Sequence, residues 1–218
     1  PVAYILGRAY FRNLTLKVGR EVLIPRPETE HLVDIALNML KSREWRRPPA
    51  LLDLGTGSGA IAISLAAEFP DAEVTATETS GDALKLAGEN ARTAGVAARV
   101  VFVQSDMFEQ LDPVDTYDLI ISNPPYVADG EWDSLPRDVR EFEPRRALSG
   151  GLDGLDFYRR IAAEGPQFLK PGGSLILEIG HTQGPAVTSL LEATGRFAEV
   201  GVEQDYAGID RVVIASRE

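Results

Sequence analysis

The sequence feature that most constrains the fold is a regular alternation of short apolar runs with helix-length segments, which begins near residue 50. This alternation is typical of a parallel β-sheet whose strands are joined by crossover helices. The expected strands lie at about 50–54, 73–78, 99–104, 117–122, 174–179, 197–203 and 211–216. The expected helices lie at about 59–68, 81–94, 154–168 and 183–194, and a loop-rich stretch runs from 123 to 153. The chain is therefore predicted to be an α/β protein.

The first 24 residues follow a different pattern. Apolar and polar residues alternate over Ala9–Phe11 and Leu14–Val18, and the two stretches are separated by Arg12 and Asn13. Such a pair of alternating stretches predicts a β-hairpin.

A proline-rich turn, Ile24–Glu30, follows the hairpin, and its two prolines exclude a strand at this point. Thr29 is expected to cap a helix whose apolar positions between Leu32 and Leu40 share one face. We accordingly divide the chain into a hairpin segment, residues 1–24, and a main domain, residues 25–218.

The charge balance limits the partners. Lys and Arg number 22 against 33 Asp and Glu, so the formal net charge is −11. This charge argues against broad electrostatic binding to nucleic acid or to an anionic membrane surface. No apolar run approaches the length of a membrane-spanning helix, and no membrane association is expected.

The chain contains no cysteine, which excludes disulfides, thiolate metal sites and cysteine nucleophiles. We therefore expect a cytoplasmic protein. The two histidines, His31 and His181, are too far apart in the sequence to suggest a metal site, and none is predicted.

A glycine-rich turn directly follows the first strand of the predicted sheet. In the run Leu51–Ala60 the glycines stand at alternate positions, Gly55, Gly57 and Gly59. Glycines at this spacing allow a sharp turn, close approach of a ligand to the backbone, and a helix N-terminus beside that ligand. The turn predicts a site for a nucleotide-like cofactor.

An acidic residue, Glu78, ends the second predicted strand, 19 residues after Gly59. A carboxylate at this place can accept hydrogen bonds from both hydroxyls of an adenosine ribose. The glycine pattern also fits dinucleotide binding, so these two features leave NAD and S-adenosylmethionine as alternatives.

The loop Asn123-Pro124-Pro125-Tyr126 follows the fourth predicted strand and favours S-adenosylmethionine. Its prolines stiffen the loop and remove two backbone donors. The side-chain oxygen of Asn123 and the carbonyl of Pro124 can then converge on a planar NH2 group, with the Tyr126 ring available for stacking. Hydrogen bonds accepted from both N–H groups would help this nitrogen, a poor nucleophile, to attack a methyl sulfonium. Hydride transfer has no use for such a loop.

These motifs together resemble a class I methyltransferase of the amino-group type, and further stretches narrow the resemblance to the HemK/PrmC family. The further stretches are Tyr4–Gly7, Leu23–Glu30, Ser105–Phe108 and Phe142–Pro144. Members of this family methylate the glutamine side-chain amide of peptide-chain release factors. The resemblance implies a Rossmann-like sheet of seven strands in the order 3-2-1-4-5-7-6, with the last strand antiparallel. It also implies a preceding small helical domain, to which nothing in this sequence corresponds.

The resemblance assigns roles to particular residues. The cofactor S-adenosylmethionine would be lined by Gly55, Thr56, Gly57, Ser58 and Gly59, with Asn123 at its reactive end. Glu78 would hold the ribose, Asp106 would meet the adenine amino group, and Met107 would pack near the ring. The acceptor glutamine would be gripped by Asn123, Pro124, Pro125 and Tyr126, of which Asn123, Pro124 and Tyr126 are the expected catalytic residues.

The expected substrate is thus the glutamine of a Gly-Gly-Gln motif in a release factor, with no direct binding to nucleic acid. Two alternatives stay open on the residues alone. An adenine-N6 nucleic-acid methyltransferase makes the same demands on the Asn123–Tyr126 loop, and a regulatory module could bind the cofactor without turnover. The oligomeric state is not predicted.

Overall fold

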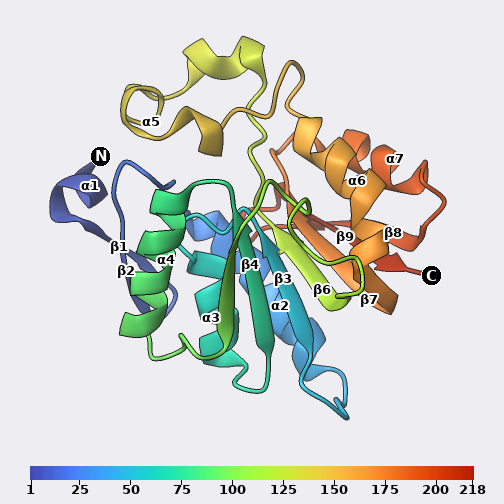
Figure 1. Cartoon of the computed structure of the whole chain (residues 1–218). Helices are drawn as coiled ribbons and strands as arrows, with labels where there is room; N and C mark the ends of the chain where they lie inside the picture. The colour runs from blue at the N-terminus through green and yellow to red at the C-terminus, as the bar shows by residue number, and fades with distance from the viewer.

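The computed structural model describes residues 1–218, and its centre is a seven-stranded mixed sheet, most of whose strands are labelled in Figure 1. The strands are β3 (Ala50–Leu54), β4 (Glu73–Glu78), β5 (Val100–Gln104), β6 (Tyr117–Ser122), β7 (Leu169–Glu178), β8 (Phe197–Gln204) and β9 (Asp210–Arg217). They are ordered β5-β4-β3-β6-β7-β9-β8, and β9 is antiparallel to both of its neighbours. The predicted strand order and the antiparallel last strand are confirmed.

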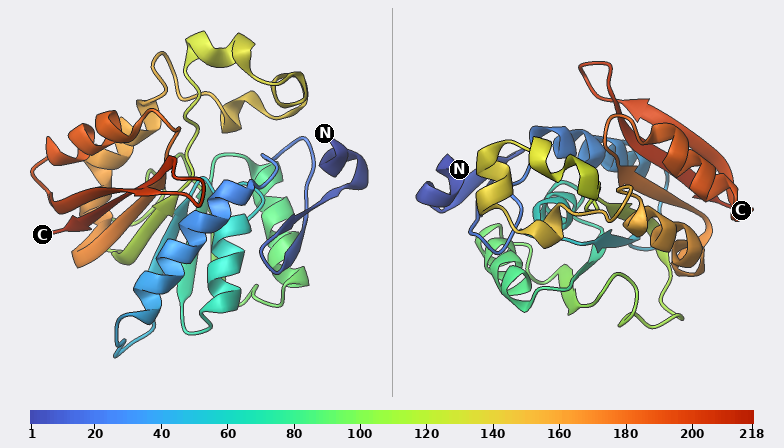
Figure 2. Two further views of the ribbon diagram at one scale, coloured as in Figure 1. Left: turned by 180° about the vertical axis from the view of Figure 1, so that it is seen from behind. Right: turned by 90° about the horizontal axis from the view of Figure 1, so that it is seen from above.

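Helices cover both faces of this sheet. One layer contains α2 (Pro27–Lys41), α3 (Ala60–Glu68) and α4 (Gly81–Thr93), and the other contains α6 (Asp156–Phe168) and α7 (Gly184–Glu192). The N- and C-terminal ends of the chain lie on opposite sides of the molecule (Figure 2). All four helices predicted after residue 50 are present, with ends within two residues of the prediction.

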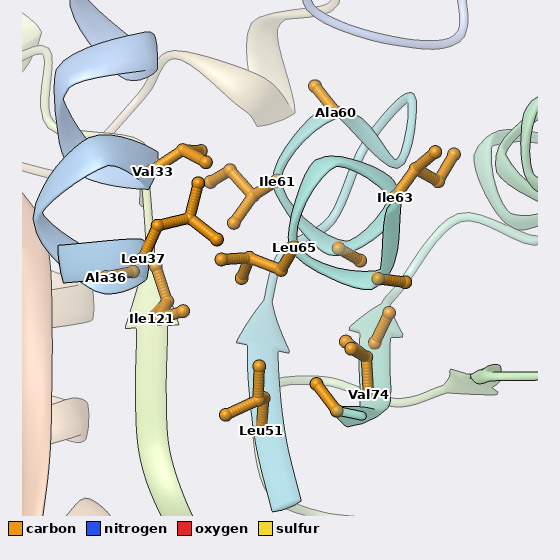
Figure 3. Close-up of a cluster of buried hydrophobic side chains, with 14 of the residues drawn as sticks. Val33, Ala36, Leu37, Leu51, Ala60, Ile61, Ile63, Leu65, Val74 and Ile121 are labelled. Carbon is orange, nitrogen blue, oxygen red and sulfur yellow. The ribbon is translucent and has the colours of Figure 1, made fainter. Parts of the chain in front are cut away.

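The apolar strands are explained by burial on both faces. Successive side chains of a strand point to opposite faces, so Leu51 packs in the core beneath α2 and α3 while Leu52 packs in the core beneath α6 and α7. Figure 3 shows the first of these cores, where Leu37 of α2 and Leu65 of α3 lie above Leu51. Alternating polarity is therefore absent from the central strands.

The N-terminal hairpin forms a separate two-stranded sheet from β1 (Arg8–Phe11) and β2 (Leu14–Lys17), as predicted. A short helix that the sequence analysis did not predict, α1 (Val2–Leu6), precedes it. None of its residues is buried. Ala3 and Tyr4 are half-buried against the hairpin and α4, but a helix of five residues is too short to show a periodic apolar pattern.

Two further expectations differ from the structure. Helix α2 begins at Pro27, with Arg26 as its cap, so the prediction that Thr29 caps this helix is wrong. Thr29 is a buried residue of the first turn. The loop-rich stretch 123–153 contains three short helices, η1 (Asp129–Ser134), α5 (Arg137–Phe142) and η2 (Arg145–Ala147), and the α5 region lies beyond one end of the sheet (Figure 1). No helix of the chain is both long and apolar enough to span a bilayer.

Arg12, in the hairpin turn, joins the hairpin to the main domain. Its Nη1 lies 2.7 Å from Asp34 Oδ1, and its Nε lies 2.5 Å from Glu68 Oε1. Asp34 belongs to α2 and Glu68 to α3, so one guanidinium connects three elements. Arg12 adopts a φ of +52°, a conformation that is strained for a residue with a side chain. These partly buried ionic hydrogen bonds therefore offset a local backbone cost.

Replacing Arg12 by methionine should lower the free energy of unfolding by about 2 kcal/mol, because it removes hydrogen bonds between charged groups but keeps an apolar stem. Urea denaturation would measure the loss. Arg46→Met, at an exposed arginine, is the matched control and should leave stability within about 0.5 kcal/mol of the wild type. Equal effects of the two substitutions would show that the Arg12 ion pairs do not stabilise the fold.

Candidate functional site

A pocket of about 280 Å³ opens at the carboxyl ends of the central strands. This is the edge at which open α/β sheets bind ligands. The strand-end residues that line it are Leu54, Gly55, Gly57, Glu78, Thr79, Ser105, Asp106, Met107, Ser122, Asn123, Pro124 and Pro125. Its other walls are formed by Glu21, Val22, Leu23, Arg146, Ala147, Phe157 and Arg160. Most of the predicted site residues are therefore brought together in one pocket.

The glycine turn forms the floor of the pocket between β3 and α3. The N–H groups of Gly55 and Thr56 both donate to the carbonyl oxygen of Thr77, at 2.9 Å each, so β4 holds the turn. Gly59 has a φ of +84°, and an added Cβ would lie 2.6 Å from Ile63 Cδ1. Of the five turn residues predicted to line the cofactor, only Gly55 and Gly57 line the pocket. The other three, Thr56, Ser58 and Gly59, are buried.

Glu78 is held at the pocket wall by hydrogen bonds from its surroundings. Its Oε2 accepts from the Gly57 N–H over 3.1 Å, and its Oε1 accepts from the Ser80 N–H over 3.0 Å. The carboxylate thus bridges the glycine turn and the start of α4. Its orientation is set before any ligand arrives.

Asp106 and Met107 lie in the turn after β5. Asp106 Oδ1 accepts from Arg160 Nη1 of α6 at 2.8 Å, which fixes the carboxylate at the pocket. Met107 is buried and has a φ of +56°. Strained backbone of this kind concentrates at ligand sites, where the surrounding structure over-determines it.

The loop after β6 lies between two pockets. Asn123 and Pro124 line the 280 Å³ pocket and also a second pocket of about 180 Å³. Tyr126 lines only the second one, together with Leu23, Arg26, Val127, Leu135, Pro136, Val139, Ala147 and Leu148. Of the four predicted loop residues, Asn123 and Pro124 are therefore the two at the junction.

Burial affects the chemistry of Tyr126. Loss of solvent, with a smaller contribution from the nearby carboxylate of Glu178, raises the pKa of its phenol to about 12. The hydroxyl is accordingly protonated at neutral pH. The backbone carbonyl of Tyr126 accepts from Gln183 Nε2 at 3.1 Å, which fixes the loop against α7.

Two buried residues behind Asn123, Thr29 and Glu178, were not among the predicted site residues, nor were the residues of the other pocket walls. The Nδ2 of Asn123 donates to Thr29 Oγ1 over 3.0 Å, and that hydroxyl donates to Glu178 Oε2 over 2.6 Å. Burial raises the pKa of Glu178 to about 7. An acidic residue at the end of the otherwise apolar run Leu175–Ile179 was the available signal.

The Phe142–Pro144 motif has a structural explanation. The side chain of Glu143 is only 1% exposed, and its Oε1 pairs with Arg26 Nη2 at 2.5 Å. Its other oxygen accepts from the Ile24 N–H at 3.2 Å. The proline-rich turn is thereby tied to the segment that walls the second pocket.

A second buried carboxyl, Asp53, lies under the glycine turn. Its Oδ2 accepts from the Thr56 hydroxyl at 2.7 Å and from the Ala62 N–H at 3.2 Å, while Oδ1 has no partner. Burial raises the pKa of this carboxyl to about 7, against the lowering effect of the two hydrogen bonds.

No group of three His, Cys, Asp or Glu side chains is arranged to hold a metal ion.

Comparison with known proteins places the sequence close to a family of methyltransferases. Residues 30–136 match the family model described as methyltransferase small domain. A release factor glutamine methyltransferase from Cereibacter sphaeroides is 48% identical over 216 residues, which are 99% of this chain and 74% of that protein. Another from Rhodopirellula baltica is 42% identical over 214 residues, 98% of this chain and 72% of that protein.

Solved structures agree on the fold. A methyltransferase from Pyrococcus furiosus superposes with a TM-score of 0.65 at 19% sequence identity. The match covers 99% of this chain and 94% of the other. The expected class I methyltransferase fold is therefore confirmed.

Asp53→Asn should make stability less dependent on pH, because the variant keeps an oxygen for Thr56 and Ala62 but cannot ionise. The folded-state pKa lies above the usual value, so the native wild-type protein binds the proton more tightly and loses stability as pH rises from about 4 to about 8. We expect the variant to be more stable than the wild type by about 1–4 kcal/mol at pH 8. At pH 4 the difference should largely disappear.

Urea denaturation over this pH range would measure the effect. Asp71→Asn, at an exposed position, is the control and should follow the wild-type profile. A parallel profile for Asp53→Asn would contradict the raised pKa.

Proposed function

Since the chain belongs to the family of release factor glutamine methyltransferases, we infer that it methylates the side-chain amide nitrogen of a glutamine in a peptide-chain release factor. S-adenosylmethionine is the methyl donor. The observation that carries this proposal is that two pockets meet at Asn123 and Pro124. A reaction between a cofactor and a protein side chain needs two binding spaces that share one boundary.

The larger pocket fits S-adenosylmethionine. No heavy atom lies within 4 Å of the position that a Cβ would take at Gly55 or Gly57, so this backbone is open to a ligand. Glu78 offers a fixed carboxylate acceptor for the ribose hydroxyls, and Asp106 with Met107 borders the side expected for adenine. When bound, the cofactor supplies an electrophilic methyl group on a sulfonium.

The Asn123–Tyr126 loop would orient the acceptor. The Asn123 side-chain oxygen and the Pro124 carbonyl can each accept a hydrogen bond from one N–H of the glutamine NH2 group. These two hydrogen bonds leave the nitrogen lone pair directed at the larger pocket. The main contribution is then positioning of two reactants in a dry space rather than proton transfer by a strong base.

The smaller pocket suits the approach of a protein loop. It is lined mostly by apolar side chains and lies under the segment that contains η1 and α5. We propose that this pocket receives the glutamine of a Gly-Gly-Gln motif, because neighbouring glycines let a backbone enter a narrow site without side-chain clashes. A release factor substrate also supports a cytoplasmic location.

The alternative, an adenine-N6 nucleic-acid methyltransferase, would use the same loop chemistry. The net charge of −11 disfavours binding to a phosphate backbone. Relatives that align with nearly the whole chain bear the release factor name. The glutamine reaction is therefore preferred.

Glu78→Ala should weaken binding of S-adenosylhomocysteine, the demethylated product, roughly 10- to 150-fold, because charge-assisted hydrogen bonds contribute about 1.5–3 kcal/mol. Isothermal titration calorimetry would measure the change. Glu73→Ala, at the exposed start of the same strand, is the matched control and should bind normally. Wild-type affinity in Glu78→Ala would remove Glu78 from the cofactor site.

Incubation with methyl-labelled S-adenosylmethionine and a release factor tests the activity. We expect one methyl group on the Gly-Gly-Gln glutamine, located by mass spectrometry, and no label on a release factor with alanine at that position. Asn123→Ala should lose most of the transfer but bind S-adenosylhomocysteine within a few-fold of the wild type, since Asn123 chiefly orients the acceptor. Comparable labelling of adenine in DNA would favour the alternative reaction.

A further inference from the structure

We propose that Glu178, acting through the hydroxyl of Thr29, fixes the direction of the Asn123 side-chain amide so that its oxygen faces the acceptor. This inference rests on the proposed function. Glu178 and Thr29 are positioning residues, since neither lines the two pockets. The three residues come from different elements: Thr29 from α2, Asn123 from the loop after β6, and Glu178 from the end of β7.

The hydroxyl of Thr29 has a single proton to donate. Thr29 is 5% exposed and Glu178 is 1% exposed, so water cannot supply alternative partners. The 2.6 Å contact with the carboxylate of Glu178 uses the hydroxyl proton, because an ionised carboxylate can only accept. Thr29 Oγ1 can then only accept from its second neighbour, Asn123, 3.0 Å away.

This constraint selects one of the two orientations of the Asn123 amide. The NH2 group must point to Thr29, and the carbonyl oxygen must point away from it. The reverse orientation would place the amide oxygen against the lone pairs of Thr29 Oγ1 and close to the negative charge of Glu178. Two buried acceptors would then face each other with no proton between them, which is unfavourable.

The selected orientation distinguishes glutamine from glutamate. An amide oxygen at the junction of the pockets accepts a hydrogen bond from a glutamine NH2 group but repels a carboxylate. With the amide reversed, its NH2 group would oppose the glutamine NH2 group and would favour glutamate. The hydrogen-bond chain therefore contributes to acceptor specificity as well as to rate.

Protonation of Glu178 should release the constraint. A neutral carboxyl can donate to Thr29, whose own proton is then free for the Asn123 oxygen. The side chains of Thr29 and Asn123 face the Glu178 carboxyl as hydrogen-bond donors, and each lowers its pKa. The other groups that face Glu178 come from several elements: Arg211 of β9, Glu28 of α2, Tyr126 of the acceptor loop and Tyr158 of α6. Burial is the largest influence and raises the pKa of Glu178 to about 7. The orienting form is the ionised one, so its population increases as pH rises through 7.

The test measures binding in the absence of turnover. Calorimetry with S-adenosylhomocysteine present would compare a release factor carrying the Gly-Gly-Gln glutamine with one carrying glutamate at that position. The proteins are the wild type, Thr29→Val, which removes the hydroxyl at constant shape, and Thr29→Ser, which restores it. Thr188→Val is the matched control, because the hydroxyl of Thr188 has no hydrogen-bond partner and lies on α7.

We expect the wild type to prefer glutamine by about tenfold or more, and Thr29→Val to reduce this preference by roughly 5- to 50-fold, as the loss of one buried polar constraint predicts. Thr29→Ser and Thr188→Val should keep the wild-type preference. Affinity for S-adenosylhomocysteine should stay within about threefold throughout. An unchanged preference in Thr29→Val would overturn the proposal.

The pH dependence provides a second readout. The wild-type kcat should rise between pH 6 and pH 8, and Glu178→Gln, which has no titrating group at this position, should lose that rise. The same rise in both proteins would overturn the role of Glu178. Failure of the wild-type protein to label any release factor would instead overturn the proposed function, which separates the two conclusions.

Discussion

Burial of the central sheet on both faces is the constraint on which the rest of this structure depends. The strands β3, β4, β6 and β7 lie between two helical layers, so polar side chains within them are costly. Polar groups can be accommodated where the strands end, because there the chain turns back to solvent. The glycine turn, Glu78 and Asn123 all occupy this edge, and the site is a consequence of how the core is covered.

Two carboxyl groups depart from this rule, and each lies beneath a loop of the site. Asp53 is bonded to the glycine turn through Thr56, and Glu178 is bonded to the acceptor loop through Thr29. Burial raises the pKa of both to about 7, so each charge reduces the stability of the folded state at neutral pH. Each carboxylate sets the direction of the hydrogen bond from its threonine, because an ionised carboxylate accepts hydrogen bonds and never donates them.

The segment around Glu143 and Arg146, which is remote in sequence from the N-terminal residues, also stabilises the site. Glu143, beyond α5, pairs with Arg26 at the start of α2, and Arg146 donates to the carbonyl oxygen of Glu21 at 2.7 Å. These contacts connect residues 21–26 with the wall of both pockets. The hairpin is connected independently, through Arg12 to α2 and α3 and through the backbone of Lys17 to the side chain of Asn90 on α4.

The sequence by itself determined the architecture and the motifs. Seven strands, their order and the glycine turn were predictable, because apolar runs, turn glycines and the resemblance to a known family all reflect local chemistry or inherited pattern. Helix α1 was not predictable, since none of its residues is buried and no apolar stripe marks it.

Only the tertiary structure decided how the motifs work together. Thr29 was expected to cap a helix, and nothing in its neighbourhood in the chain suggests otherwise. The structure places it between Asn123 and Glu178, which are 94 and 149 positions away. The orientation of the Asn123 amide thus depends on hydrogen bonds among three distant elements, and a pattern of neighbouring residues carries no information about contacts that form only when the sheet and its helices have packed.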